Sequence, residues 1–446
     1  MLTFHLRGKI YFMKRSKLVT LVGLSVLLVG CGSTNKATDA GKTSDAPVAS
    51  DATDKEDHSS LKTTITLGIA NAQQTFIKSA AEKFLDDNGY TNVTVAIVEV
   101  AEDKATSITD FTADTAPDIY NYASDQTGSL YAKGALAEVP TVYSTAMKAD
   151  MGDASANAGK LGSSYYGYPY AGDNGYFLYY NKDYVSETQK DSVEGILEAA
   201  QAANMKFAYA LDTGSSFFAI GTFMTFGARY EVSLNKDGTF KSASSDFDGD
   251  NGILGGKAVK SLLDSELVDT TNDGARSKAP TQANNFVAAV EGSWNYASFK
   301  ESLGDKMGVA KLPTITVDGN TANLCSFLGY KLYGVNPNKS ADNPERLALL
   351  HTLANYLVSA KVQEERFDAL SIVPTNTTVK ALDKVQSSPL VKALGDQAAY
   401  SVAQTVVPSN IWTGSDTAVA ALKLEGADVS TVMKTYADTI AASTTY

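Results

Sequence analysis

The sequence has few of the residues on which most soluble hydrolases depend. It contains three histidines and two cysteines among 446 residues. His5 and His58 lie in the first 61 residues, which have no regular core pattern, so only His351 lies in the remainder. This scarcity disfavours a His-dependent triad, a Cys/His pair and a zinc site with several histidines. Chemistry that uses a pair of carboxylates is not excluded.

Long apolar runs are also scarce, and the main one ends at a cysteine. A basic stretch, residues 14–17, precedes an apolar run over 18–29 that is too short for a stable transmembrane helix, and Cys31 follows Gly30. The segment resembles the lipobox of bacterial lipoproteins, in which the thiol is acylated with a diacylglycerol and the preceding bond is cut. We therefore expect residues 1–30 to be a lipoprotein signal peptide, with Cys31 as the lipidated residue. A signal anchor with a chance cysteine is the alternative.

The segment after Cys31 lacks the means to form a core. Residues 31–61 are rich in Ser, Thr, Ala, Asp and Lys and contain no Phe, Trp or Tyr. Such a composition cannot bury enough apolar surface to offset the entropy of ordering, which predicts a flexible linker. The remaining residues, 62–446, exceed what one hydrophobic core usually holds and favour two lobes. Met13, directly before the basic stretch, is a candidate start besides Met1.

Positive charge is in the minority. The formal net charge is −12, and the first 30 residues contain five Lys and Arg but no acid, so the rest is more acidic still. An acidic body disfavours nucleic acid and anionic lipid as partners. No apolar run after Cys31 is long enough to cross a bilayer, so we expect contact with the membrane through the lipid only.

Two segments that suggest reactive or metal sites have a simpler structural interpretation. Cys325 lies in the apolar stretch 324–328 and is expected to be a small core residue rather than a reactive thiol. Residues 246–252 suggest a calcium loop, but the sixth and twelfth positions are Asn251 and Lys257 where an EF-hand needs Gly and an acid. We interpret them as a polar turn leading into a helix, and expect no metal site.

Hydrophobic patterning predicts an α/β protein. Alternating β-branched residues over 63–69 and 93–100 predict strands, and apolar spacing over 76–88 predicts the helix between them. A polar segment expected to be helical follows, and then a strand near 117–120. This order is typical of a parallel α/β lobe. Beyond it, apolar spacing predicts helices over 193–205, 217–226, 258–267, 284–290, 417–422 and 429–442.

Tryptophan is scarce, and both copies lie in polar surroundings. Trp294 directly follows Glu-Gly-Ser, and Trp412 follows Pro-Ser-Asn after one further residue, Ile411; we expect both on turns. Aromatic rings in polar turns can stack on the C–H face of a pyranose, while nearby polar side chains bond its hydroxyls. Residues 120–126 and 168–176 are two further clusters of Tyr with Asp, Asn or Gln. Together they indicate carbohydrate binding. The alternative for each tryptophan is a structural role, in which a half-buried ring holds its loop in place.

An ordered series of short motifs carries a family resemblance. They are Ala116-Pro117-Asp118-Ile119, Gly134-Ala135-Leu136-Ala137-Glu138, Tyr168-Pro169, Tyr180-Asn181-Lys182-Asp183, Gly292-Ser293-Trp294, Gly308-Val309-Ala310-Lys311-Leu312-Pro313, Ala354-Asn355-Tyr356-Leu357, and Trp412 with Thr417-Ala418-Val419. In this order they resemble the extracellular solute-binding proteins of sugar ABC importers, and most of all the maltose/maltodextrin-binding proteins. The resemblance covers nearly everything after Thr63.

The resemblance implies a two-lobed α/β fold of the periplasmic-binding-protein type (type II), with lobes joined by hinge strands. The N-terminal lobe is then expected to comprise residues 62–172 and 333–373, and the C-terminal lobe residues 173–332 and 374–446. The chain is expected to cross between lobes near 171–172, 328–330 and 373–375.

The resemblance also implies a set of ligand-binding residues. Tyr122, Asp125, Trp294 and Trp412 match family positions that contact sugar, and Phe217 lies near another. Two positions depart from the maltose-type pattern: Gln126 replaces a basic residue, and Asn174, with Asp173 beside it, replaces a Glu. The loop 70–74 also lacks the expected acidic and basic pair. The predicted ligand-binding set is Tyr122, Asp125, Gln126, Asp173, Asn174, Phe217, Trp294 and Trp412.

The function that follows is a monomeric, non-enzymatic receptor without a cofactor, anchored by lipid outside the cytoplasm. It would deliver a maltodextrin-type oligosaccharide to ABC permease subunits in the membrane. One alternative is a same-fold receptor for another sugar, a polyol or a host glycan. A second is a secreted glycosidase that uses Asp125 and Asp173 as its carboxylates.

Overall fold

The computed structural model describes residues 58–270 and 286–446. The predictions for the signal peptide 1–30, for Cys31 and for most of the linker 31–61 lie outside these residues. Residues 55–446 group as one unit, and the description concerns that unit alone.

A ten-stranded mixed sheet runs through the described chain in the order β10-β7-β11-β6-β15-β3-β1-β2, with β12 paired to β6 and β16 to β15. Its strands are β1 (Thr63–Ile69), β2 (Val93–Glu99), β3 (Ile119–Ala123), β6 (Tyr168–Asn181), β7 (Phe207–Ala210), β10 (Val268–Asp269), β11 (Phe286–Gly292), β12 (Met307–Ala310), β15 (Ser326–Val335) and β16 (Ser401–Ala403). Three two-stranded sheets pair β4 (Lys160–Leu161) with β5 (Ser164–Tyr165), β8 (Tyr230–Leu234) with β9 (Phe240–Ser245), and β13 (Thr314–Val317) with β14 (Asn320–Asn323).

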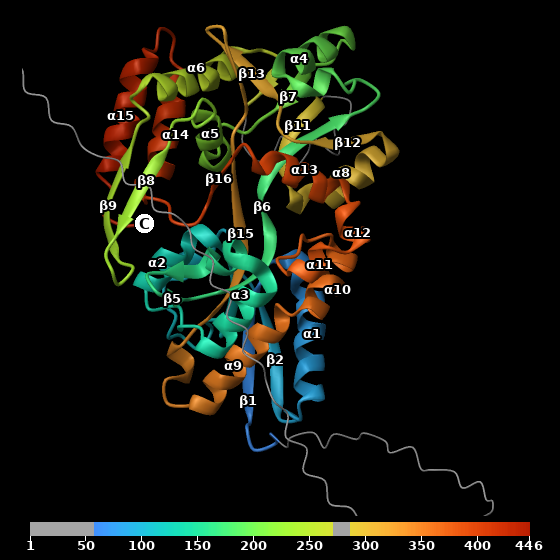
Figure 1. Ribbon diagram of the computed structural model, residues 1–446, viewed down its shortest axis with the longest axis vertical. Coiled ribbons are helices and arrows are strands. Elements are labelled where there is room, and N and C mark those ends of the chain that lie inside the picture. Colours follow the sequence, from blue (N-terminus) through green and yellow to red (C-terminus); the bar gives the residue numbers. More distant parts are fainter. Residues whose placement is uncertain (1–57, 271–285) are drawn as a thin grey trace, which may run out of the picture. The chain divides into compact units, whose positions relative to one another are not determined.

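The helices of the described chain flank this sheet (Figure 1). They are α1 (Gln74–Asp87), α2 (Thr127–Ala132), α3 (Thr141–Ala156), α4 (Val193–Ala202), α5 (Ser216–Phe223), α6 (Asp250–Asp264), α8 (Tyr296–Leu303), α9 (Pro344–Leu357), α10 (Ala360–Leu370), α11 (Thr377–Lys380), α12 (Asp383–Gln386), α13 (Pro389–Ala398), α14 (Asn410–Leu422) and α15 (Val429–Ala441).

The chain forms two lobes because the two longest strands end in different hydrophobic cores. Tyr168 and Tyr170 of β6 pack with β1, α1 and α9, whereas Tyr176 and Leu178 of the same strand pack with α4, α5, α6, α14 and α15. β15 is divided in the same way, with Tyr333 in the first core and Phe327 in the second. The two antiparallel strands extend through both the lower and the upper half of Figure 1. Two lobes therefore share one sheet.

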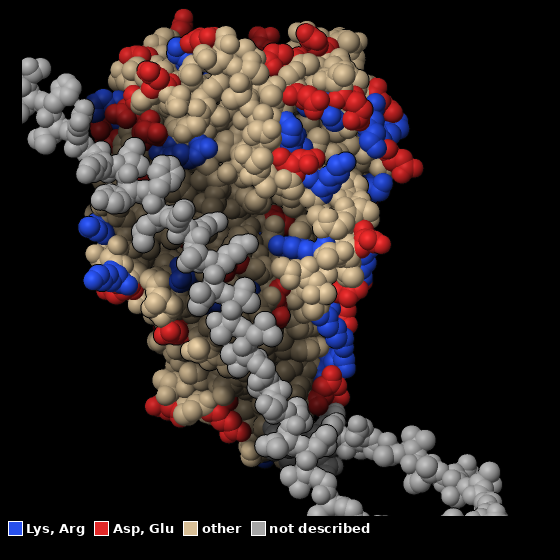
Figure 2. All heavy atoms as spheres, in the orientation of Figure 1, with Lys and Arg blue, Asp and Glu red and all other residues tan. Residues whose placement is uncertain are grey.

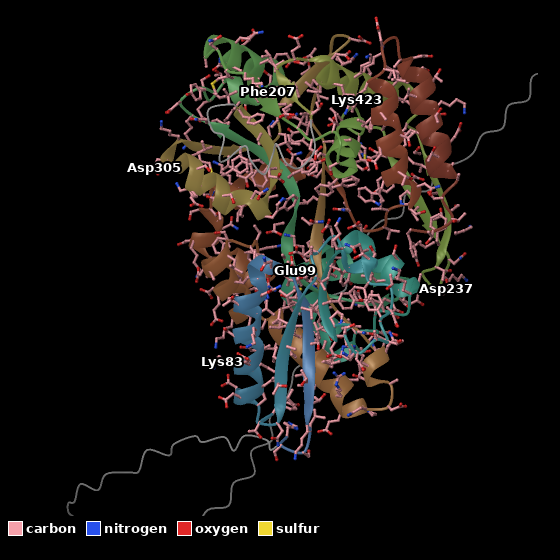
Figure 3. The ribbon with its side chains drawn as sticks, turned by 180° about the vertical axis from the view of Figure 1, so that it is seen from behind. Lys83, Glu99, Phe207, Asp237, Asp305 and Lys423 are labelled. Atoms are coloured by element: carbon pink, nitrogen blue, oxygen red, sulfur yellow. The ribbon has the colours of Figure 1, made fainter. Side chains whose placement is uncertain are left out.

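The first lobe has the predicted parallel arrangement. β1 pairs in parallel with β2 and β3, and α1 crosses between β1 and β2. The polar segment over 101–116, expected to be helical, instead contains only the short 3₁₀ turn Ala105–Ser107, so that expectation is wrong. Seen from behind, Glu99 at the end of β2 lies at the level where the two halves meet (Figure 3).

The second lobe corrects one assignment of secondary structure. Residues 284–290 were expected to be helical, but 286–292 form β11, which pairs in parallel with β7 and antiparallel with β6. Every residue of β11 is buried. A strand buried on both faces has no period-2 pattern, so a short apolar run cannot be distinguished from a helix by its spacing.

The segments expected to cross between lobes lie together. Gly329 and Leu328 of β15 pair with Asn174 and Gly175 of β6. The Gly172 amide donates a 2.9 Å hydrogen bond to the Val373 carbonyl, which brings in the third segment. The exact lobe boundaries at 172, 332 and 373 stay a prediction.

Candidate functional site

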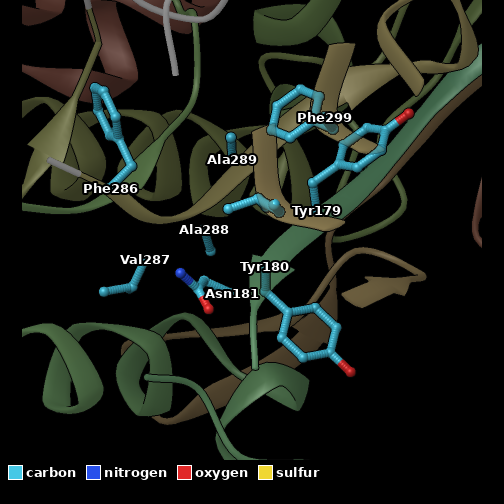
Figure 4. A pocket seen from close by; sticks show the side chains of 9 residues that line it. Tyr179, Tyr180, Asn181, Phe286, Val287, Ala288, Ala289 and Phe299 are labelled. Atoms are coloured by element: carbon cyan, nitrogen blue, oxygen red, sulfur yellow. The ribbon is translucent and has the colours of Figure 1, made fainter. Parts of the chain in front are cut away.

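A cavity of about 970 Å³ lies between the two lobes. Its lining residues include Glu102, Asp103, Lys104, Thr106, Asp125, Gln126 and Ser129 from the first lobe, Asn174 and Lys331 from β6 and β15, and Asp212, Ser216, Phe217, Glu291, Trp294, Gln404, Trp412 and Tyr446. A second cavity, beside Tyr179 and Phe299 (Figure 4), holds only about 20 Å³, which leaves room for little more than a water molecule. Of these two cavities in the described part of the chain, the larger can hold a ligand of several rings.

One wall of the large cavity consists of aromatic rings from three separate elements. The Phe217 ring of α5 lies 6.2 Å from that of Trp294 and 5.8 Å from that of Phe327, centroid to centroid. The Trp412 ring lies 5.9 Å from that of Phe327. The structure thus brings Phe217, Trp294 and Trp412 together around a buried Phe327, which the sequence did not single out.

The two tryptophans are positioned by different local structures. Trp294 lies in the 3₁₀ turn Ser293–Asn295 directly after β11, and 45% of its surface is exposed. Trp412 was expected on a loop turn, and this expectation is wrong. It lies in the first helical turn of α14, where its carbonyl accepts a hydrogen bond from Ser216 Oγ at 2.9 Å. The Pro-Ser-Asn sequence before Trp412 begins α14. Residues of these types are common both in turns and at the start of a helix, so composition alone did not distinguish the two.

The first lobe contributes a carboxylate to the cavity lining directly after β3. Asp125 lies in the 3₁₀ turn Ser124–Gln126, which follows that strand. Burial raises the pKa of its carboxyl group from 3.8 to about 6, while a hydrogen bond with Gln404 acts in the opposite direction. Asp125 Oδ1 is buried without a hydrogen-bond partner in the protein. The carboxylate of this cavity-lining residue therefore keeps an unused hydrogen-bond acceptor.

Gln126 braces the loop beside Asp125 rather than presenting a free amide. Its Nε2 donates to the Glu102 carbonyl at 2.6 Å, and its Oε1 accepts from the Thr106 amide at 3.0 Å. Both ends of the side chain are thus used by the loop after β2. That loop places Glu102 in the cavity wall, where its Oε1 accepts from Gln73 Nε2 at 2.9 Å and from the Tyr170 hydroxyl at 3.1 Å.

Asn174 lies at the floor of the cavity, where the lobes join. Its Nδ2 donates to Gln404 Oε1 at 2.9 Å, and the Gln404 carbonyl accepts from Ser124 Oγ of the first lobe at 2.5 Å. Glu102, Lys331 and Gln404 were not selected from the sequence. Gln404 follows a short parallel strand and carries no motif, so nothing in the local sequence distinguishes it.

Two predicted ligand residues are not brought to the cavity. Tyr122 is fully buried in the first lobe, where its hydroxyl donates to the Tyr166 carbonyl at 3.3 Å. Because β3 is buried on both faces, the Tyr122 ring lies in the core. The family resemblance did not indicate which face of the strand borders the cavity. Asp173 is 1% exposed and is paired with Lys331 rather than lining the cavity. The two carboxylates proposed for a glycosidase therefore do not face one ligand space together.

Three other kinds of site could lie outside the cavity in the described residues: a metal site, a reactive thiol or a nucleic-acid surface. Within residues 58–270 and 286–446, no three His, Cys, Asp or Glu side chains are grouped so as to hold a metal ion. Cys325 is buried, as expected, and burial raises the pKa of its thiol to about 11. On the face shown in Figure 2, basic and acidic side chains are interspersed, without the continuous basic patch that nucleic acid requires.

Comparison with known proteins assigns the family. The model of the bacterial extracellular solute-binding proteins matches residues 79–393, which is most of the chain. The chain belongs to this family. Its members are solute-binding receptors outside the cytoplasm, not enzymes. None of the helices in the described part of the chain is long and apolar enough to span a bilayer.

Solved structures share the fold of this solute-binding protein over nearly their whole length. A protein solved with acarbose has 25% sequence identity and a TM-score of 0.74, covering 85% of this chain and 99% of its own. A maltodextrin-binding protein from L. casei BL23, solved without ligand, has 21% identity and a TM-score of 0.70, with 86% and 100% coverage. A maltotriose-binding protein from Thermus thermophilus, solved with maltotriose, has 20% identity and a TM-score of 0.68, with 84% and 98% coverage. No curated protein sequence matches the chain.

Proposed function

We propose that this solute-binding protein captures a maltodextrin-type oligosaccharide and presents it to an ABC importer. The observation that carries the proposal is the pairing of walls across one cavity. Phe217, Trp294 and Trp412 supply aromatic faces, and Asp125 and Glu102 supply carboxylate acceptors opposite them. The cavity, at about 970 Å³, is large enough for several pyranose rings.

The two walls match the two kinds of surface on a sugar. The C–H faces of a pyranose are apolar and stack on aromatic rings, and its hydroxyls donate to carboxylates. Because the walls belong to different lobes, a sugar that touches both binds best when the lobes are closed. Binding then shifts the population toward the closed state, which a permease can distinguish from the open one.

The proposal extends to the membrane. Cys31 would carry a lipid, and residues 31–61 would tether the two lobes near the permease subunits without contributing to binding. The protein would act as a monomer, with the lipid as its direct contact with the bilayer. The signal-like segment before Cys31 and the composition of residues 31–61 support this part of the proposal.

Isothermal titration of the purified protein with a panel of ligands tests the function. We expect maltotriose and acarbose to bind, and cellotriose, sorbitol and chitotriose to bind weakly or not at all. Chromatography after long incubation should recover the maltotriose intact. Binding confined to sorbitol or to a β-linked sugar would replace the maltodextrin assignment by another ligand of the same fold. Accumulation of shortened sugar over many turnovers would contradict a receptor.

A further inference from the structure

A buried ion pair lies where the two lobes join. Lys331 of β15 and Asp173 of β6 are 5% and 1% exposed, and their Nζ and Oδ1 atoms are 3.3 Å apart. The pairing of β15 with β6 is irregular on both sides of Lys331, between Gly329 and Lys331 and again between Lys331 and Leu332. Such bulges redirect side chains. Here the extra residues lie on β6, and the facing Lys331 of β15 lines the cavity.

The same carboxylate also holds the third segment between the lobes. Asp173 Oδ2 accepts a hydrogen bond from the Val373 amide at 3.2 Å, and the adjacent Gly172 amide donates to the Val373 carbonyl at 2.9 Å. The three segments expected to cross between the lobes therefore meet at Asp173. A change in lobe angle must alter the surroundings of this carboxylate and of its partner Lys331.

The lysine also reaches the ligand wall. Its Nζ lies 5.7 Å from the centroid of the Trp294 ring, within the range of a cation–π contact. Ser293, the neighbour of Trp294, donates from Oγ to the Asp173 carbonyl at 3.2 Å. The turn that carries Trp294 is thus joined to the strands between the lobes by the Ser293 side chain, which bonds the main chain of β6, and by the charge of Lys331.

The pair is not explained by stability alone. A buried ion pair often contributes no more to folding than an apolar pair of the same size, because both charges lose their hydration. Burial tends to lower the pKa of Lys331, but Asp173 and Glu102 counteract this and keep the pKa above its ordinary value. The lysine therefore stays charged beside the Trp294 ring.

We propose that Lys331 is a positioning residue that sets the orientation of the Trp294 ring and couples it to the junction between the lobes. This inference rests on the proposed function, because it assumes that Trp294 stacks on the ligand. The ring is otherwise nearly half exposed, and a cation beside it restricts the orientations it can adopt. In this way Asp173, although absent from the cavity wall, acts on the ligand through Lys331.

The test uses Trp294 as its own reporter. In a Trp412→Phe background Trp294 is the one remaining tryptophan of the sequence. Lys331→Met alone would leave a buried, unpaired carboxylate, so the main variant is Lys331→Met with Asp173→Asn, which removes both charges. Lys331→Arg is the conservative variant. Asp118→Asn with Arg346→Met is the control, because it removes another buried ion pair, 2.9 Å long, at a distance from the cavity.

We expect the doubly neutral variant to change the emission spectrum of Trp294 and its quenching by acrylamide in the absence of ligand. It should also weaken maltotriose binding about tenfold. Lys331→Arg should keep the emission spectrum and the affinity close to those of the wild type. The control variant should change neither of them. Unchanged ligand-free emission in the doubly neutral variant would overturn the proposal, whatever happens to affinity. If wild type does not bind maltotriose, the proposed function fails, but the emission comparison still decides the role of Lys331.

Discussion

At the scale of single residues, the site depends on a few side chains with unusual surroundings. Trp294 is one of the large apolar residues most exposed in the described chain, and Asp125 Oδ1 is buried without a partner. An exposed ring and an unsatisfied carboxylate oxygen both raise the free energy of the empty protein. A bound ligand that covers the ring and donates to the oxygen removes both costs, so these residues are where binding should be most sensitive to substitution.

Replacing either tryptophan should weaken sugar binding. We expect Trp294→Ala and Trp412→Ala each to cost about 1–3 kcal/mol of binding free energy, the usual effect of losing a desolvated aromatic anchor. Tyr184→Ala is the control, since Tyr184 is also exposed but lies outside the cavity wall. Titration calorimetry with maltotriose measures all three. Wild-type affinity in both tryptophan variants would show that these rings only hold their local structure in place and do not contact the ligand.

Sugar affinity should depend on pH through Asp125. Its pKa is raised by burial to about 6, so the carboxylate dominates above pH 6 and the acid dominates below it. A carboxylate accepts a hydroxyl hydrogen bond more strongly than a neutral carboxyl group does. Affinity should therefore fall as the pH is lowered from 7.5 to 5. In Asp125→Asn this step should disappear, and an equal pH dependence in the variant would assign the step to another group.

At the scale of elements, the ends of strands place the proposed ligand-binding side chains, and small residues leave space for them. β3 leads into the turn with Asp125, and β11 leads into the turn with Trp294. Gly292, the last residue of β11, has a backbone φ of −86°, so no strain requires glycine there. The requirement is steric, because a Cβ on Gly292 would lie 2.2 Å from the Trp294 ring.

Gly292→Ala should therefore displace the Trp294 ring without unfolding the protein. We expect maltotriose affinity to fall about tenfold or more, as when the ring itself is removed, because the ring must leave its place over residue 292. Gly395→Ala in α13 is the matched control, since a Cβ there meets nothing within 4 Å. That control should bind normally and be slightly more stable in thermal unfolding. Normal affinity in Gly292→Ala would show that the ring tolerates other positions.

At the scale of the whole molecule, two separately packed lobes share β6 and β15, and other segments also touch across the boundary. The hairpin β8–β9 extends toward the first lobe, with Asp237 marking its tip in Figure 3. At that tip, a Cβ on Gly238 would lie 3.0 Å from Leu161 Cβ. Tyr446 joins the same region, with its hydroxyl donating to the Gly238 carbonyl at 3.1 Å and its carbonyl accepting from Ser129 at 2.6 Å.

Ligand binding should close the two lobes. Asp125 and Trp294, the proposed ligand contacts, lie on different lobes, and rigid lobes can swing about the strand residues that join them. Small-angle scattering should give a smaller radius of gyration with maltotriose than without it. Cellotriose, as a non-binding sugar, should leave the radius unchanged. Tight binding without compaction would contradict closure about these strands.

Membrane attachment should depend on Cys31. We expect Cys31→Ser to abolish labelling by radioactive fatty acid, and to release the protein into the medium or leave it unprocessed. Cys325→Ser is the control, because Cys325 is buried in the second lobe. Unchanged labelling and fractionation of the Cys31 variant would exclude the lipobox interpretation.

Much of the architecture was determined by the sequence itself. Periodic apolar spacing located α1, α4 and α15, because each of these helices buries one stripe. The same reasoning failed at β11, which is buried on both faces and has no period to detect. The scarcity of tryptophan, and the polar residues around both copies, identified Trp294 and Trp412 before any contact was known.

Only the tertiary structure decided which of the candidate residues meet. It brought Asp125, Asn174, Phe217, Trp294 and Trp412 to one cavity and left Tyr122 in the core. Glu102, Lys331 and Gln404 joined them from segments without any motif, because their roles come from the pairing of strands far apart in the chain. Local sequence encodes helices, strands and turns, whereas the composition of a cavity between two lobes depends on long-range packing that no single segment specifies.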